Sequence, residues 1–209
     1  MWYVIQVAGG REEDTAALIR GQIPHGVMEE CFIPRKERVK KFHGRWRCVE
    51  EILFPGYVFT ATRQPEALFL SLKRVTRLTK LLRSDREIDY FCPLSREEEA
   101  LIRSIGDPRH VTRLSRLQIR DNREEEGGGQ NGRGWKAAGP GREILVLSGP
   151  LKNQEGRIVS CNLHKREVTV RLPFMGQETE VRMGIELVGE KKENAAFRKS
   201  VLKEADEKI

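Results

Sequence analysis

Over residues 1–105, some segments have hydrophobic residues at the spacing of strands and others at the spacing of helices. The pattern changes after about residue 105. The segments rich in aromatic and β-branched residues, which predict strands, are residues 2–7, 29–34, 57–60 and 77–82. The segments with apolar residues at helical spacing, which predict helices, are residues 11–22, 64–76 and 95–105. Ser95-Arg-Glu-Glu98 has the pattern of a capping box at the start of the last helix. Residues 1–105 are therefore expected to form one compact domain of mixed α and β structure.

A basic hairpin is predicted within this domain. Residues 39–42 and 45–49 suit two strand arms, and His43-Gly44 suits the tip between them. One acid interrupts a long basic series over residues 35–47, so this hairpin is the strongest basic patch in the chain.

The chain changes character after residue 105. Residues 106–141 are expected to be a flexible linker, because the stretch 122–141 is rich in Gly and nearly free of apolar residues that could form a core. The short strands predicted beyond it are residues 143–147, 156–161, 168–172, 179–182 and 185–188. Their spacing predicts a small β-barrel over residues 142–189. In the tail, residues 190–209, Phe197, Val201 and Ala205 have the spacing of a short amphipathic helix.

Composition narrows the class of protein. The chain has 209 residues, 38% of them hydrophobic, and a formal net charge of +7. No window has the roughly 20 apolar residues that a spanning helix needs, and the first residues do not resemble a signal peptide, so a cytoplasmic protein is expected. The four Cys and four His stand at no metal-ligand spacing, so neither metal nor disulfide is predicted.

Two motifs carry a family resemblance. Residues 146–159, Val-Leu-Ser-Gly-Pro-Leu-Lys-Asn-Gln-Glu-Gly-Arg-Ile-Val, resemble a KOW motif, in which two strands flank a Gly-Pro turn. Trp2-Tyr3 and Leu53-Phe-Pro-Gly-Tyr-Val-Phe59 precede it in the chain. This order resembles the NusG family of transcription elongation factors, which have an NGN domain, a linker and a KOW domain.

The resemblance implies a fold and a function. The expected fold is α+β, with an NGN domain over residues 1–105 and an SH3-like KOW barrel. Residues 31–34, 44–46, 51–59, 162–166 and 183–188 are most similar to the LoaP branch of the family, whose members are processive antiterminators. The implied function is therefore readthrough of terminators in long operons, by binding RNA polymerase and a hairpin in the nascent leader RNA.

The resemblance assigns the NGN domain to the clamp coiled coil of RNA polymerase. The residues expected at this interface are Trp2, Tyr3, Phe54, Pro55, Gly56 and Tyr57. Phe54 is expected to be the exposed ring, because a turn follows it directly. The alternative is a turn followed by a buried strand, with at least half of these aromatic residues in the core.

Two sets of polar residues are candidates for nucleic-acid contact. In the NGN domain, those expected near non-template DNA are Lys73, Arg74, Arg77, Lys80 and Arg83. In the KOW domain, those expected to bind the leader RNA are Lys152, Asn153, Arg157, Asn162, His164, Lys165, Arg166 and Arg171. A solvated cationic face and ordinary polar turns remain the alternatives for the two sets.

No motif for covalent chemistry is present: no nucleophile–base pair, phosphate-binding Gly loop or metal cluster is recognisable, so the sequence predicts neither an enzyme nor a cofactor. A monomer is expected. The rival functions are a general NusG-type elongation factor and a KOW-type RNA-binding structural protein.

Overall fold

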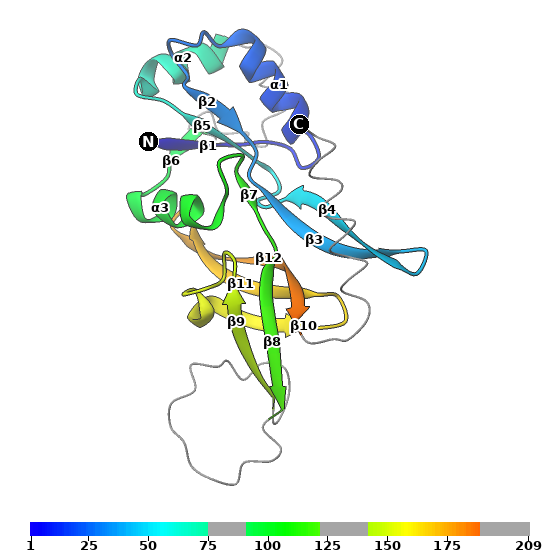
Figure 1. Cartoon of the computed structure of the whole chain (residues 1–209). Helices are drawn as coiled ribbons and strands as arrows, with labels where there is room; N and C mark the ends of the chain where they lie inside the picture. Colours follow the sequence, from blue (N-terminus) through cyan, green and yellow to red (C-terminus); the bar gives the residue numbers. More distant parts are fainter. Residues whose placement is uncertain (75–90, 122–141, 189–209) are drawn as a thin grey trace. The chain divides into compact units, whose positions relative to one another are not determined.

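The computed structural model describes residues 1–74, 91–121 and 142–188 (Figure 1). The strand expected at residues 77–82, the Gly-rich segment and the helix expected in the tail lie outside these residues. No helix in the described part of the chain is long and apolar enough to cross a membrane.

The chain divides into two compact units. Unit 1 comprises Met1–Arg35, Ile52–Val111 and Pro173–Thr179; unit 2 comprises Lys36–Glu51, Thr112–Leu172 and Glu180–Ile209. This division differs from the expected one, in which residues 1–105 form one domain and 142–189 another. The hairpin at Lys36–Glu51 belongs to unit 2, and the turn at Pro173–Thr179 belongs to unit 1.

Unit 1 is built on a four-stranded sheet with the strand order β2-β5-β1-β6. Its strands are β1 (Trp2–Gln6), β2 (Glu30–Phe32), β5 (Tyr57–Ala61) and β6 (Phe91–Pro93). Its helices are α1 (Glu12–Gln22), α2 (Pro65–Arg74) and α3 (Arg96–Ile105). β5 runs antiparallel to β1 and β2, and β6 runs antiparallel to β1. The expected α+β fold is confirmed.

The alternation of side chains along the strands gives this sheet two apolar faces. Ile5 and Val58 pack with buried residues of α1 and α2 on one face. Trp2 and Phe59 pack edge to face on the other, which α3 covers (Figure 1). The sheet therefore separates a layer holding α1 and α2 from a layer holding α3.

The start of α3 confirms the capping box. The Ser95 hydroxyl accepts a hydrogen bond from the Glu98 backbone N–H at 3.1 Å, and the Glu98 carboxylate accepts one from the Ser95 N–H at 2.8 Å. Two backbone donors of the first turn are thus satisfied by local residues. The helix begins at Arg96, next to the position that the sequence pattern predicts.

Unit 2 contains most of a five-stranded sheet with the order β10-β11-β12-β8-β9. Its strands are β8 (Ser115–Asp121), β9 (Arg142–Ser148), β10 (Ile158–Asn162), β11 (Glu167–Phe174) and β12 (Gln177–Val188), with a 3₁₀ turn η1 at Glu155–Arg157. Buried residues from all of these strands form its core, including Leu117, Ile144, Ile158, Val170 and Ile185. β3 (Arg35–Phe42) and β4 (Arg45–Ile52) form the basic hairpin, with β7 (Val111–Thr112) next to β3.

Two strand predictions in the second half of the chain are corrected. Residues 115–121, which were expected in the linker, form β8, because Leu117 and Ile119 pair with Val146 and Ile144 of β9. The strands expected at 179–182 and 185–188 are one continuous strand, β12. Gly184 lies within this strand and is buried, and a Cβ there would meet Glu37 O and lie 3.0 Å from the Arg38 Cα.

Candidate functional site

Two hydrogen bonds within unit 1 hold the turn at Pro55-Gly56. The Gly56 N–H donates to the Glu12 carboxylate at 2.7 Å, and its carbonyl accepts from the Val7 N–H at 2.8 Å. Gly56 has φ +87°, a conformation that favours glycine. These contacts fix the direction in which the chain enters β5 and place Phe54 and Tyr57 on either side of the turn.

Phe54 is not the exposed ring that the sequence analysis expects. Only 3% of its surface is exposed, because it lies between Phe59 of β5 and Phe174 of β11. The Phe54 and Phe174 rings are stacked, with centroids 4.2 Å apart and planes at 14°. Tyr57 meets the same Phe174 ring edge to face at 5.0 Å and is half-buried. The turn at residues 173–179 therefore covers the predicted aromatic face.

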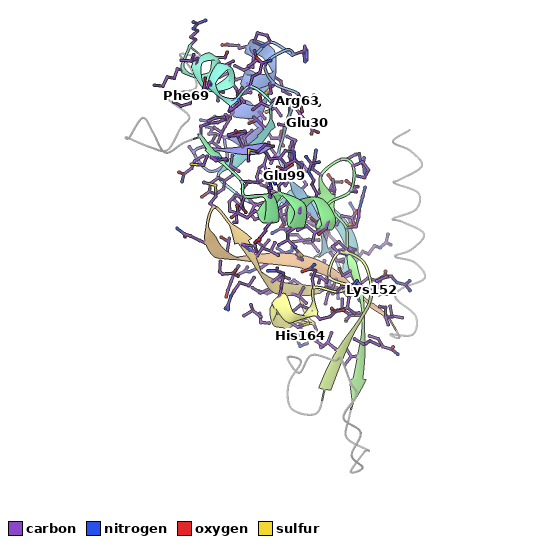
Figure 2. The ribbon with its side chains drawn as sticks, turned by 90° about the vertical axis from the view of Figure 1, so that its left-hand side faces the viewer. Glu30, Arg63, Phe69, Glu99, Lys152 and His164 are labelled. Carbon is purple, nitrogen blue, oxygen red and sulfur yellow. The ribbon has the colours of Figure 1, made fainter. Side chains whose placement is uncertain are left out.

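Trp2 belongs to the core. It is 1% exposed and packs edge to face against Phe32, with centroids 4.8 Å apart. α3 covers the indole, and Arg103 lies 4.0 Å from the ring centroid. Glu99 of the same helix, labelled in Figure 2, accepts a hydrogen bond from the backbone N–H of Trp2 at 2.9 Å. Trp2 therefore supports the aromatic face from beneath and cannot contact a partner directly.

Tyr3 lies on the opposite face of β1 from Trp2. Its ring stacks on Phe91 with centroids 4.7 Å apart and planes at 5°, and Phe91 in turn contacts Phe69 of α2. The structure thus separates Tyr3 from Phe54 and Tyr57, although the sequence analysis groups all three. Pro55 is exposed beside the turn.

Glu98 fixes the covering turn to α3. Its Oε1 accepts a hydrogen bond from the Gly176 N–H at 2.9 Å, while Oε2 accepts from Ser95. Burial alone would raise the pKa of Glu98, but the hydrogen bonds from Gly176, Ser95 and Met175 outweigh it and lower the pKa. Sequence reasoning missed this second role, and also the role of Phe174. The capping box identifies Glu98, but nothing local in the sequence connects it with Gly176.

The candidate DNA-contacting cations are described only in part. Lys73 and Arg74 are exposed on the last turn of α2. The Lys73 ammonium lies 4.7 Å from the centroid of Phe69, which Figure 2 labels. Arg77, Lys80 and Arg83 lie outside the described residues.

One group of the candidate RNA-binding residues lies between β9 and β10. Lys152 and Asn153 are exposed, and Asn153 has φ +68°. Arg157 is half-buried, and its Nε donates to Gln154 Oε1 at 2.8 Å. The first two residues are available to a ligand, while Arg157 is partly occupied within its own loop.

A second group lies in the turn between β10 and β11, a different loop from that of Lys152 (Figure 2). Asn162, His164 and Lys165 are exposed, and Asn162 Oδ1 accepts from the Lys165 N–H at 3.0 Å. Arg166 is not exposed, as contact with RNA would require. It is 4% exposed, and its guanidinium lies 4.5 Å from the centroid of the Trp46 ring.

Arg171, the last of the candidate RNA-binding residues, lies on β11. It is exposed and forms an ion pair with Glu180 at 3.2 Å.

The structure also bears on metal binding and on two of the cysteine thiols. In the segments with assigned structure, no cluster of His, Cys, Asp or Glu could hold a metal ion. Burial raises the pKa of the Cys31 thiol to about 12 and that of Cys161 to about 11, which keeps both protonated and unreactive near neutral pH.

Comparison with known proteins finds similarity to the NusG family. The family model described as "Transcription termination factor nusG" matches residues 1–103. The chain is 25% identical over 186 residues to the transcription termination/antitermination protein NusG of Haemophilus influenzae, covering 87% of this chain and 89% of that protein. It is 26% identical to the NusG of Pasteurella multocida (87% and 90% covered) and 20% identical to that of Bacillus subtilis (87% and 93%).

A solved structure, "Domain interaction in Thermotoga maritima NusG", is 18% identical with a TM-score of 0.42 and covers 88% of this chain and 92% of that one.

These relatives are named as transcription termination/antitermination proteins, a class of transcription factor and not of enzyme. Residues 1–103 are thus similar to the NusG family, and 87% of the chain is similar to the NusG proteins of these bacteria.

Proposed function

We propose that the chain is a bacterial antitermination factor of the LoaP type, which binds RNA polymerase through unit 1 and nascent leader RNA through unit 2. The polymerase clamp coiled coil would dock on the face formed by Phe54, Pro55 and Tyr57. The observation that carries this proposal is that Phe54 and Tyr57 both contact the Phe174 ring, so together they form a face that accepts an apolar group. Protein interfaces use such aromatic faces as anchors.

The covering turn has a direct consequence for this proposal. Polymerase and residues 173–179 compete for one face, so the protein must release the turn before it binds. Uncovering one Phe side chain exposes apolar surface at a cost of about 1.5–3 kcal/mol. Opening on that scale leaves a minor population competent to bind, and polymerase shifts the equilibrium by its preference for the open form.

Unit 2 supplies the proposed RNA contacts. Lys152, Asn153, Asn162, His164 and Lys165 are exposed, which suits contact with phosphates and with the bases of a hairpin loop. RNA held by unit 2 would raise the effective concentration of unit 1 at the transcribing enzyme. Suppressed pausing and readthrough of terminators along a long operon would follow. Lys73 and Arg74 would add salt-dependent contacts with non-template DNA.

Two substitutions test the polymerase face with opposite expected outcomes. Native-gel shift of a stalled elongation complex is measured with the full chain, Phe54→Ala and Phe174→Ala. Phe174→Ala removes the cover and should strengthen binding several-fold, whereas Phe54→Ala removes the anchor and should abolish it. Tyr57→Ala is the companion variant, because its half-buried ring contributes less to the core. Weaker binding by Phe174→Ala, under conditions in which this variant is shown to be folded, would show that the turn does not compete with polymerase.

A second assay separates the specialised role from its rivals. Terminator readthrough in vitro is compared on templates with and without the leader of a candidate operon. A LoaP-type factor requires the leader. A general NusG-type factor acts equally on both templates, and an RNA-binding structural protein does not shift the elongation complex at all.

A further inference from the structure

The β3–β4 hairpin separates its charges along its length. At its base two of the acids are paired: Glu37 accepts from Arg113 at 2.6 Å and from the Leu114 N–H at 3.0 Å. Glu51 pairs with Arg38 at 3.2 Å and with Lys40 at 2.5 Å. Glu51 therefore neutralises two cations of the hairpin and Glu37 neutralises Arg113, and none of these pairs reaches the tip.

The tip of the hairpin, residues 41–47, carries cations and one exposed ring. Lys41, Arg45 and Arg47 are exposed there, and no ion pair with a described residue involves Arg45 or Arg47. Phe42 between them is 43% exposed, one of the few large apolar side chains on the described surface. A partly exposed ring surrounded by cations is the composition with which proteins bind single-stranded nucleic acid: rings stack on bases, and cations bind phosphates.

Trp46 joins this tip to the β10–β11 turn within unit 2. The Arg166 guanidinium lies 4.5 Å from the centroid of the Trp46 ring, and the Lys41 ammonium lies 5.7 Å from it. The backbone carbonyl of Arg166 also accepts a hydrogen bond from the Ile185 N–H at 2.9 Å, so β12 fixes the turn. Arg166, which follows the exposed His164 and Lys165 in the chain, therefore joins their turn to Trp46 of the hairpin.

We propose that the hairpin tip and the β10–β11 turn form one surface for single-stranded RNA. Phe42 stacks on a base; Lys41, Arg45, Arg47 and Lys165 bind the phosphates along the strand. Arg166 and Trp46 do not touch RNA and act as positioning residues that join the two halves. This inference rests on the RNA-binding part of the proposed function and deepens it, because it adds the hairpin to a surface otherwise confined to the barrel loops.

The test measures fluorescence anisotropy of a labelled, unstructured RNA of about a dozen nucleotides and of the matched DNA, with the full chain. Phe42→Ala should weaken RNA binding by about 5-fold or more, the loss expected when one base loses its stacking partner. Arg45→Gln and Arg47→Gln should each reduce the slope of log K against log salt by about 0.7. Matched controls on unit 1, Leu70→Ala for an exposed apolar residue and Arg63→Gln for an exposed cation, should change neither quantity.

The outcomes separate the two levels of the proposal. If Lys165→Ala weakens RNA binding but the Phe42, Arg45 and Arg47 variants do not, the hairpin inference is overturned and RNA binding by the barrel stands. If the chain binds no RNA, both fail. If the matched DNA binds equally well, the assignment to RNA is overturned. Trp46→Phe should keep RNA affinity near that of the parent, whereas Trp46→Ala should weaken it as much as Lys165→Ala does, because the turn loses its support. Equal effects of both Trp46 variants would contradict the positioning role.

Discussion

Phe54 and Phe42 are both followed closely by a glycine-containing turn, yet their environments are opposite. Phe54 precedes Pro55-Gly56 in unit 1 and is 3% exposed, whereas Phe42 precedes His43-Gly44 in unit 2 and is 43% exposed. The first ring has two apolar partners, Phe59 and Phe174. The second has cationic neighbours in the chain and is partly exposed to solvent.

The comparison shows that a turn does not determine whether the ring before it is buried. What decides is whether another part of the chain supplies an apolar partner, and for Phe54 that partner comes from the end of β11. Cations on either side of Phe42 keep water close to that ring, because removing a charge from water is costly. The two rings therefore suit different partners: an apolar protein surface for Phe54 and a charged polymer for Phe42.

The largest expected effect is a difference in the free energy of unfolding between variants of these two rings. Phe54→Ala removes a buried ring and should lower the free energy of unfolding by about 3–5 kcal/mol. Phe42→Ala removes a partly exposed surface ring, and the change should stay within about 0.5 kcal/mol. Urea denaturation of both variants measures the difference. Equal losses would mean that Phe42 is packed against something in solution.

Much of unit 1 could be predicted because its signals are local. The capping box at Ser95 predicts the start of α3, and the aromatic and β-branched run at Tyr57–Ala61 predicts β5. β8 was missed because its sequence, SRLQIRD, is short and polar at every second position next to a Gly-rich segment. Its strand structure depends on pairing with β9 and β12, which no local pattern contains.

The candidate site could be predicted less well, for the same reason. Sequence reasoning places Phe54 and Tyr57 at one turn, and the structure agrees. It cannot find the cover on Phe54 or the ring against Arg166, because Phe174 and Trp46 lie far away along the chain. Exposure is a property of such distant pairs, so the exposed residues were the least predictable part of the site.

The next largest effect concerns how the exposed hairpin is fixed to its unit. A Cβ at Gly184 of β12 would clash with Glu37 O and Arg38 Cα of β3. These are backbone atoms within strands, so they cannot move aside as a flexible side chain could. Gly184→Ala should therefore destabilise unit 2 by about 3 kcal/mol. Gly156→Ala is the matched control, because nothing lies within 4 Å of its Cβ position. Thermal unfolding with Trp fluorescence compares them, and a neutral Gly184→Ala would show that β3 does not rest on β12.

A smaller effect concerns the cover on Phe54 and depends on pH. The pKa of Glu98 is lowered in the folded protein, so its ionised form contributes stability above the unfolded value of about 4.3. That contribution is lost as the pH falls through the lower folded pKa, when the carboxylate is protonated. Glu98→Gln should lose about 1–2 kcal/mol at pH 7.

Urea midpoints between pH 7 and pH 3 measure this dependence. The parent should approach the Glu98→Gln variant as the pH falls, because both then lack the carboxylate charge. Curves that stay parallel over this range would exclude a role for that charge in holding residues 173–179. An elongation-complex shift at pH 7 adds a functional readout: Glu98→Gln should bind polymerase more tightly, as Phe174→Ala does.

The smallest effect extends the comparison from aromatic residues to arginines. Arg171 and Arg166 both belong to the candidate RNA-binding set, but Arg171 forms an exposed ion pair with Glu180, while Arg166 is buried against Trp46. Arg171→Ala should change stability by only about 0.2–1 kcal/mol, and 0.5 M salt should remove the difference. Arg166→Ala should cost more and should keep its effect in salt, because its contact is buried. Urea denaturation of both variants at low and high salt measures this contrast. A salt-sensitive Arg166→Ala would mean that its guanidinium is solvated and free to bind RNA, as the sequence analysis first suggests.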